Sequence, residues 1–140
     1  MIRSILCLVI VGLILSGGAA IAIDSEKETA ALSAAKNWLA TVDAGKYAAS
    51  WKEAAAFLKN AVTPEQLELS MKATRQPLGK LISRKMLTKS YKTSLPGAPD
   101  GEYVVIQFGT SFENKKTAIE TVTPMLDKDG KWRVSGYYIK

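Results

Sequence analysis

The chain has 140 residues, with 19 lysines and arginines against 13 aspartates and glutamates, and it has no histidine. Its single cysteine, Cys7, lies in an apolar N-terminal segment. The lack of histidine and of any further cysteine excludes the usual Ser-His-Asp and Cys-His nucleophile systems. It also excludes structural zinc, iron–sulfur and c-type haem sites, so we expect no metal and no other cofactor.

The N-terminal residues have the pattern of an export signal. Arg3 supplies a positive charge, residues 5–15 are an unbroken apolar run, and small residues follow up to Ala20-Ile21-Ala22. The apolar run is about half of the roughly 20 residues that a membrane span needs, so an uncleaved anchor is the less favoured alternative. We expect residues 1–22 to be a signal peptide cleaved near Ala22, and residues 23–140 to form one exported domain, in the periplasm.

The charge of this domain indicates no particular partner. The 19 basic residues less Arg3 leave 18, which against 13 acidic residues give a net charge of +5. The lysines are scattered, and the densest pair, Lys115-Lys116, lies in an expected turn. This distribution is typical of a solvated surface, with binding to an anionic envelope polymer as the alternative. We expect no nucleic-acid partner.

The first half of the domain has helical periodicity. An S-x-x-E capping box at Ser25 predicts the start of a first helix, which Gly45 should end. The apolar spacing continues over residues 47–58 and predicts a second helix. Thr63, followed by Pro64 and by a glutamine three residues after the cap, predicts the start of a third.

The second half has the pattern of β-strands. Apolar residues alternate with polar ones, and turn residues separate the segments. Four strands are expected over residues 81–95, 102–112, 117–126 and 131–139. Three helices followed by a four-stranded antiparallel meander predict an α+β domain, with the helices packed on one face of the sheet.

Several segments carry a resemblance to known proteins. They are Trp38-Leu39-x-x-x-Asp43-x-Gly45-x-Tyr47-Ala48-x-Ser50-Trp51, Arg75-x-Pro77-Leu78-Gly79-x-x-x-Ser83-Arg84, residues 95–103, Glu120-Thr121-Val122 and Trp132-Arg133-Val134-x-Gly136-Tyr137. With these segments the chain resembles a bacterial exported family known as domain of unknown function 4019. The order of helices and strands resembles the cone-shaped, nuclear-transport-factor-like superfamily. The resemblance implies this fold and export, and it implies no activity because the family has none assigned.

The segment Pro96–Gly101 contains two prolines and two glycines before an expected strand. A phosphate-binding loop is followed by the start of a helix, and prolines remove the backbone donors that an anion site needs. We therefore expect a rigid corner between the first two strands, in which Gly97 and Gly101 serve backbone geometry. A partner-binding lip is the alternative.

The segment Lys128-Asp129-Gly130 suits a three-residue hairpin loop better than a calcium loop, because the further ligands of an EF-hand are missing. Such a loop places Asp127 opposite Lys131 and fixes the register of the last two strands. The expected pairs are Leu126 with Trp132, Pro124 with Val134, Val122 with Gly136, and Glu120 with Tyr138. The preceding turn should place Glu120 opposite Thr110.

This register places one carboxylate, Glu120, on a face that is otherwise apolar. A charge there must be paired, protonated or exposed at the mouth of the cone. Arg75 and Arg84 are the expected partners, and Tyr138 should lie beside Glu120, near a pocket. These four residues are the candidates for ligand binding, with a structural ion pair or a rim position as the alternative.

The sequence contains no recognisable catalytic constellation. We expect an exported, non-catalytic binding or interaction module for an unknown small molecule or envelope component. The alternatives are a small isomerase, lyase or hydrolase with a carboxylate base in the cone, and a homodimer that pairs through its sheet. A deep, closed pocket with a buried carboxylate would favour the enzyme. A shallow cone filled by Trp and Leu side chains would favour the module.

Overall fold

A computed structural model describes residues 17–140, with side chains from Ser25 onward, so most of the expected signal peptide lies outside the described residues. The elements are α1 (Gly17–Asp43), α2 (Tyr47–Lys52), α3 (Ala56–Ala61), α4 (Pro64–Thr74), the 3-10 helix η1 (Gln76–Leu78), β1 (Leu81–Lys92), β2 (Tyr103–Phe112), β3 (Lys115–Leu126) and β4 (Trp132–Ile139). The strands form one antiparallel sheet in the order β1-β2-β3-β4. The expected α+β class and four-stranded sheet are confirmed.

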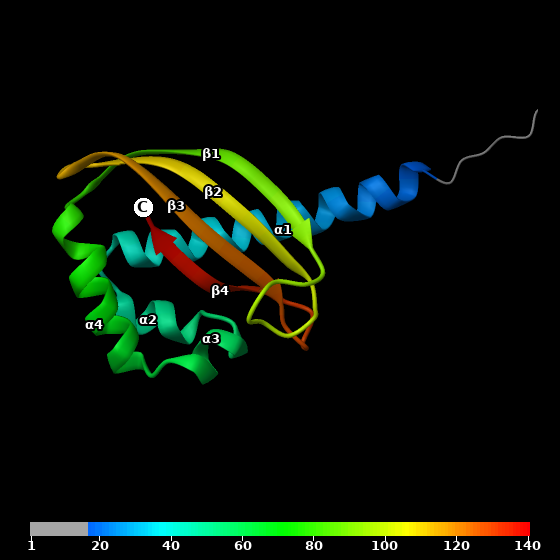
Figure 1. The fold of residues 1–140 in the computed structure, drawn as a ribbon, viewed down its shortest axis with the longest axis horizontal. Helices are drawn as coiled ribbons and strands as arrows, with labels where there is room; N and C mark the ends of the chain where they lie inside the picture. The colour runs from blue at the N-terminus through cyan, green and yellow to red at the C-terminus, as the bar shows by residue number, and fades with distance from the viewer. Residues whose placement is uncertain (1–16) are drawn as a thin grey trace, which may run out of the picture.

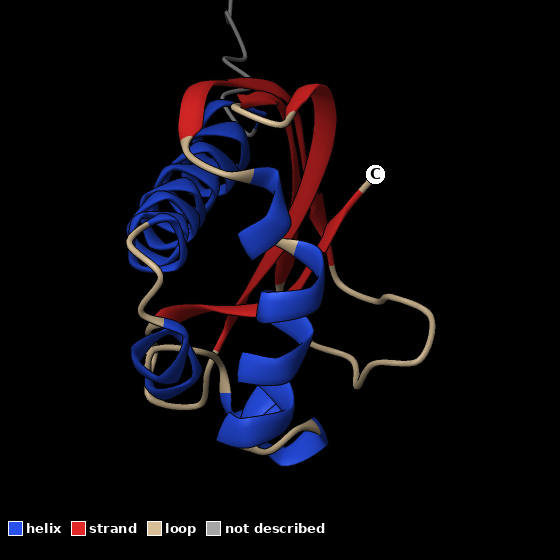
Figure 2. Ribbon diagram, turned by 90° about the vertical axis from the view of Figure 1, so that its left-hand side faces the viewer, coloured by secondary structure: helices blue, strands red, loops and turns tan. Residues whose placement is uncertain are grey.

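The sheet curves over α1, which contacts all four strands (Figure 1). Helices α2 and α4 pack on each other, and α3 packs against the edge strand β4. In the view turned by 90° the sheet and α1 form two layers (Figure 2), and α4 lies at one end of the molecule (Figure 1). None of the helices within residues 17–140 is long and apolar enough to cross a membrane.

Helix α1 runs through Ser25 instead of beginning there, so the predicted cap at Ser25 is wrong. The Thr29 Oγ1 donates to the Ser25 carbonyl at 2.8 Å, a contact between neighbouring turns of a continuous helix. Alanines precede Ser25 in the chain, and their high helix propensity allows the helix to continue across the capping box. At the other end, Gly45 has φ +74°, the left-handed conformation expected just after a helix.

The expected second helix is two short helices, α2 and α3, separated by residues 53–55. The Ala55 N–H donates to the Val134 carbonyl on the edge of β4 at 2.8 Å. Ala54 and Ala55 are both fully buried, so the break lets small residues pack closely against the sheet. Helical periodicity cannot show this break, because its cause is a hydrogen bond to a distant strand.

The start of α4 agrees with the sequence. The Gln66 N–H donates to Thr63 Oγ1 at 3.1 Å, and the Thr63 N–H donates to Gln66 Oε1 at 2.9 Å. Pro64 occupies the first turn, where no backbone donor is required. After α4 the chain passes through η1 to Gly79, whose φ of +76° turns it into β1.

The core fills the space between the helices and the inner face of the sheet. Trp38, Leu39 and Val42 of α1 are buried against alternate residues of β2. The buried β2 residues on this face are Val104, Ile106, Phe108, Thr110 and Phe112, and Tyr103 at the start of β2 is also buried. The space between the helices and the sheet is thus filled by Trp, Leu and other large apolar side chains.

The hairpin between β3 and β4 begins in the expected register. The Asp127 N–H donates to the Lys131 carbonyl at 2.9 Å, and Gly130 has φ +82°. Leu126 pairs with Trp132, and Pro124 pairs with Val134. The three-residue loop therefore has the conformation that its sequence predicts.

A bulge between Thr123 and Pro124 then shifts the register by one residue. Glu120 pairs with Ile139, and Thr121 pairs with Tyr138, so the expected pairing of Glu120 with Tyr138 is wrong. Val122 pairs with Tyr137 instead of Gly136. Because side chains alternate between faces, this shift turns Tyr137 towards the core and Tyr138 outwards.

On the other side of β3, Glu120 pairs with Phe108, and Thr110 pairs with Ala118. The predicted pairing of Glu120 with Thr110 is therefore wrong by two residues, because the turn after Phe112 is tighter than expected. A two-residue shift preserves the face on which each side chain lies, so Glu120 still points inwards.

The segment Pro96–Gly101 lies in the connection between β1 and β2, as expected. Tyr103 donates its hydroxyl to the Pro99 carbonyl at 2.5 Å, and the Gly101 N–H donates to the Thr93 carbonyl at 3.0 Å. Gly97 has φ +75°, whereas Gly101 is not in the left-handed region. Of the two glycines, backbone geometry requires only Gly97.

This difference predicts the effect of two matched substitutions. Gly97→Ala places a Cβ in open space but in the left-handed conformation, so it should lower the free energy of unfolding by about 1 kcal/mol. Gly101→Ala places a Cβ 3.7 Å from Tyr103 Cε2, an ordinary contact, and should change it by less than about 0.5 kcal/mol. Urea unfolding measures both, and equal losses would contradict the assignment.

Candidate functional site

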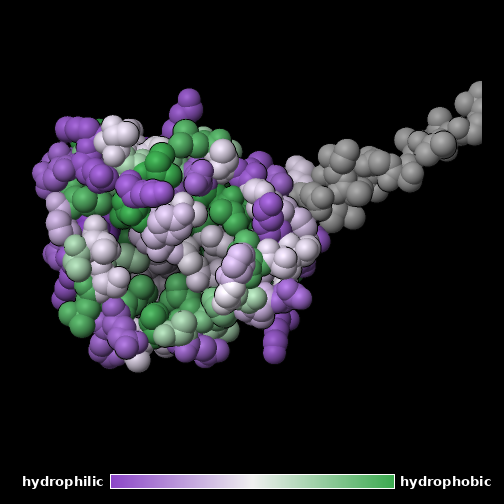
Figure 3. Space-filling view, viewed as in Figure 1, coloured by the Kyte–Doolittle hydropathy of each residue, from purple (hydrophilic) through white to green (hydrophobic). Residues whose placement is uncertain are grey.

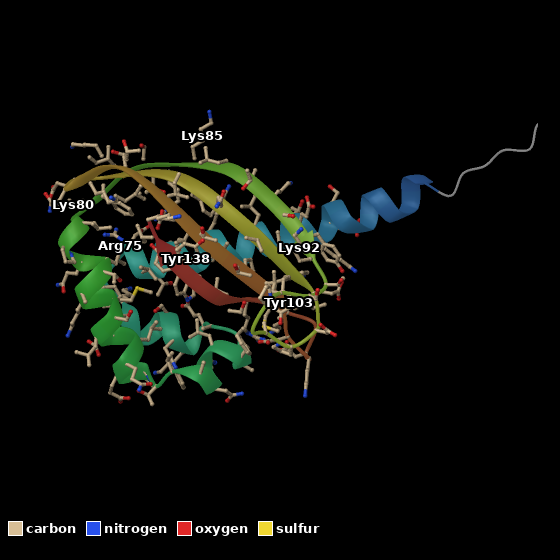
Figure 4. All side chains as sticks on the ribbon, in the orientation of Figure 1. Arg75, Lys80, Lys85, Lys92, Tyr103 and Tyr138 are labelled. Atoms are coloured by element: carbon tan, nitrogen blue, oxygen red, sulfur yellow. The ribbon has the colours of Figure 1, made fainter. Side chains whose placement is uncertain are left out.

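Charged side chains from four parts of the chain meet at one end of the inner sheet face. Together with two hydroxyl groups they form what we call the ion network: Asp43, Arg75, Arg84, Thr110, Glu120 and Tyr137. Arg75 follows α4 and points towards the strands (Figure 4). Asp43 is the last residue of α1. The remaining four members lie on the strands, one on each: Arg84, Thr110, Glu120 and Tyr137.

Arg84 stands at the centre of the network and holds two carboxylates. Its Nε donates to Glu120 Oε1 at 2.7 Å, and its Nη2 donates to Glu120 Oε2 at 3.2 Å. Its Nη1 and Nη2 donate to the two oxygens of Asp43 at 2.7 and 3.0 Å. Each carboxylate is bound in a two-point contact, which the planar guanidinium of arginine provides and the single ammonium of lysine cannot.

Glu120 is 0% exposed and is saturated with hydrogen bonds. Besides Arg84, Thr110 Oγ1 donates to its Oε1 at 2.5 Å, and the Tyr137 hydroxyl donates to its Oε2. A buried carboxylate without such partners would carry a large desolvation penalty. The four donated hydrogen bonds explain how the charge is tolerated inside the core.

Arg75 closes the other side of the network. Its Nη2 donates to Asp43 Oδ1 at 3.2 Å, and its Nη1 donates to the Gly79 carbonyl at 2.7 Å. The guanidinium lies 4.3 Å from the ring centroid of Phe112, in a cation–π contact. With two arginines and two carboxylates, the network has no net charge.

The environment keeps both central donors protonated. Burial raises the pKa of the Tyr137 phenol far above its ordinary value, and the charge of Glu120 and the hydrogen bond to it act in the same direction. Burial lowers the pKa of Arg84, but the hydrogen bonds to Asp43 and Glu120 outweigh it and raise the pKa. Tyr137 and Arg84 are therefore protonated at neutral pH and act as hydrogen-bond donors.

The residues that form the site differ from those expected. Arg84 contacts Glu120, whereas Arg75 contacts Asp43 and does not reach Glu120. Tyr138 is 57% exposed and lies away from the network. Sequence reasoning missed Asp43 and Tyr137. The position of Asp43, four residues after the buried Leu39 on the same helix face, was an available signal, whereas Tyr137 depends on the bulge.

Two small hollows lie beside the network. One, of about 240 Å³, lies between α1 and β1 and reaches Asp43 and Arg84. The other, of about 210 Å³, lies between α4 and the end of β4 and reaches Tyr137 and Tyr138. Glu120, the one fully buried carboxylate among the described residues, lines neither hollow. Within residues 25–140, no group of three or more acidic side chains is arranged to hold a metal ion.

A third hollow, which we call the corner groove, has a volume of about 600 Å³. It lies at the opposite end of the sheet, between α3, the connection of β1 to β2, and the hairpin of β3 and β4. Its lining residues are Ala56, Phe57, Asn60, Pro99, Asp100, Gly101, Met125, Leu126, Asp127, Lys128, Asp129 and Arg133. The space-filling view shows a face of the molecule that is hollowed near its middle, with hydrophobic groups among the hydrophilic ones (Figure 3).

The family model described as "Protein of unknown function (DUF4019)" matches residues 34–137, and the chain belongs to this family. The matched range contains every member of the ion network and the whole lining of the corner groove. No curated protein and no solved structure gave a significant match. The family assignment therefore agrees with the resemblance seen in the sequence and leaves the function open.

The first prediction for the network concerns the coupling of its charges. Glu120→Leu should lower the free energy of unfolding by about 3–5 kcal/mol, because Arg84 loses a buried partner. Arg84→Met should have a comparable effect. The double variant should lose less than the sum of the two by at least about 1 kcal/mol, because neither charge is then left unpaired.

Urea unfolding of the four proteins measures this coupling. Arg133→Met is the matched control, because Arg133 also holds two carboxylates but lies at the surface. Its loss should be much smaller. Additive losses at Arg84 and Glu120 would contradict the assigned contact.

The second prediction concerns pH. In the unfolded chain the Tyr137 phenol ionises near pH 10, whereas the fold keeps it protonated because its pKa is raised. The stability from this group is therefore complete below about pH 10 and falls as the pH rises further, by up to about 1.4 kcal/mol per pH unit.

Tyr137→Phe should make the alkaline loss of stability shallower, at the cost of a lower stability at neutral pH. Chemical unfolding between pH 9 and pH 11 measures the slope. Tyr138→Phe is the control, because it removes an exposed hydroxyl and leaves Tyr137 in place. A slope that Tyr137→Phe leaves unchanged would contradict the prediction.

Proposed function

We propose that the protein is a non-catalytic binding module that recognises a partner with its surface, while the ion network holds the fold together. The observation that carries this proposal is the state of Glu120. This carboxylate has no exposed surface, and four donated hydrogen bonds occupy its two oxygens. A general base must reach the proton that it abstracts, which Glu120 does not in this arrangement.

The filling of the cone supports the same proposal. Trp38 donates its indole N–H to the Ser50 carbonyl at 2.9 Å and packs edge-on against Tyr137, with ring centroids 5.1 Å apart. Leu39 and Phe108 are buried beside them. Side chains thus occupy the space in which a cone-shaped enzyme would hold its substrate.

The proposal includes export and a nuclear-transport-factor-like architecture. Support for export comes from the N-terminal charge, apolar run and small-x-small sequence. Support for the architecture comes from the order of helices followed by a curved meander that covers them. The ligand is then a small molecule or another component of the cell envelope.

The corner groove is the best-supported binding surface. Its volume of about 600 Å³ is within the range of ligand sites, while the two hollows beside the network are below it. The groove combines partly exposed apolar side chains with charged groups on its rim. In this proposal, Arg75, Arg84 and Glu120 support the fold, and Tyr138 belongs to a separate exposed face.

Self-association through the sheet is a second candidate. The outer face of the sheet carries exposed large apolar side chains, with Leu87 51% and Tyr138 57% exposed. Apolar groups of this size on one face are typical of contact surfaces. Sedimentation of the wild type and of Leu87→Lys distinguishes a dimer through this face from a monomer.

The proposed function predicts the behaviour of the protein isolated from its own cells. Native mass spectrometry of the tagged wild type should show a ligand or partner at a fixed ratio. Glu120→Gln, checked for folding by circular dichroism, should retain it, because Glu120 is sealed from the surface. A bound compound that the wild type converts and Glu120→Gln leaves unchanged would overturn the proposal and support the enzyme.

A further inference from the structure

The corner groove has walls from three separate parts of the chain. Helix α3 contributes Phe57, the corner contributes Pro99 and Asp100, and the end of β3 contributes Met125 and Leu126. The corner segment, Pro96–Gly101, contains two prolines and two glycines, and no member of the ion network lies in it. Besides connecting two strands, it forms part of the rim of the corner groove, the largest of the three hollows described above.

The walls are fixed by hydrogen bonds before any ligand arrives. The Pro99 carbonyl accepts from the Tyr103 hydroxyl at 2.5 Å, and the Leu126 N–H donates to the Glu102 carbonyl at 2.9 Å. The start of α3 is attached to β4 by the Ala55 N–H, which donates to the Val134 carbonyl at 2.8 Å. A rigid groove loses little conformational entropy on binding.

The floor of the groove is apolar. Phe57, Met125 and Leu126 are only partly buried, although each is a large hydrophobic side chain. Each would contribute to binding if a partner covered it, at roughly 25 cal/mol per Å² of apolar surface removed from water. The floor therefore favours an apolar group on the ligand.

The rim of the groove is acidic. Asp127 and Asp129 share one guanidinium, that of Arg133, with contacts of 2.8 Å each. Asp100 has no ion pair among the described residues. The rim therefore has three carboxylates and two cations, the cations being Lys128 and Arg133. The chain as a whole has a net charge of +6. A negative rim on a basic protein favours a cationic group on the ligand.

The charge of the rim is maintained over a wide pH range. The hydrogen bonds from Arg133 and from the Lys131 backbone lower the pKa of Asp129 to about 2. Arg133 is held by Asp127 and Asp129 at once, so it is not free to neutralise Asp100. Asp100 is thus the carboxylate that a ligand cation can take as its partner.

We infer that the corner groove binds a peptide segment of a partner protein, with an Arg or Lys side chain placed at Asp100 and a neighbouring apolar side chain placed on Phe57 and Met125. A peptide fits better than a free small molecule, because the groove is half-open and small ligands need most of their surface enclosed. This inference rests on the proposed binding function and names the class of its partner.

Fluorescence anisotropy with labelled heptapeptides tests the inference on the full chain. The probes are Gly-Ser-Leu-Arg-Phe-Ser-Gly, the same peptide with Glu in place of Arg, and the same peptide with Ser in place of Leu and Phe. The first should bind saturably, and both of the others should bind at least about fivefold more weakly. Equal binding of the three, or no saturable binding of the first, would overturn the inference.

A matched pair of variants locates the binding. Asp100→Lys should weaken binding of the arginine peptide at least about fivefold, because it reverses the charge that faces the cation. Glu113→Lys makes the same charge change on an exposed residue at the opposite end of the sheet and should leave binding within about twofold. Equal weakening by both would show attraction by overall charge alone and would overturn the assignment to the groove.

A milder variant covers the case in which Asp100→Lys disturbs the corner. Asp100→Asn keeps the size of the side chain and should still weaken binding, with an unchanged circular dichroism spectrum. The two proposals fail separately. If the peptide does not bind but native mass spectrometry still shows a partner, only the peptide inference is wrong. If a bound compound is turned over, the proposed binding function is wrong.

Discussion

The two-sided contact of Arg84 is the interaction on which the rest of the structure depends. One guanidinium binds Asp43 from α1 and Glu120 from β3, while Arg84 itself lies on β1. Helix α1 and two strands are thereby fixed at one point, and Arg75 attaches the end of α4 to the same point through Asp43. The domain has no disulfide to link its layers. These directional ion pairs fix the orientation of the layers, which apolar packing alone does not do.

The same contact supports the proposal of a binding module. A catalytic carboxylate needs a free oxygen, whereas both oxygens of the fully buried Glu120 accept hydrogen bonds. Tyr137, which has the chemistry of a proton donor, donates a hydrogen bond to Glu120, and burial and the charge of Glu120 raise its pKa and keep it protonated. Groups of the type that an enzyme of this shape would use are present, but they satisfy one another.

The parts of the fold that depend on neighbouring residues could be predicted from the sequence, and those that depend on distant residues could not. The Thr63 cap and the Asp127–Lys131 loop are local and follow from their sequences. The break before Ala55 is caused by Val134, about 80 residues away, and the bulge at Pro124 by pairing within the sheet. In the site, Glu120 was found from its face, whereas Tyr137 was missed because one bulged residue exchanged it with Tyr138.

The two ends of the sheet use charge in opposite ways, and this contrast links the structure to binding. At the network end, two arginines and two carboxylates match in charge; Arg75 and Glu120 are buried, and Asp43 and Arg84 are mostly buried. At the groove end, two aspartates share Arg133, Asp100 has no ion pair among the described residues, and apolar side chains are partly exposed. Full pairing stabilises a fold but offers nothing to a ligand, whereas incomplete pairing beside an apolar floor does. The stable end therefore supports the rigid elements that present the open one.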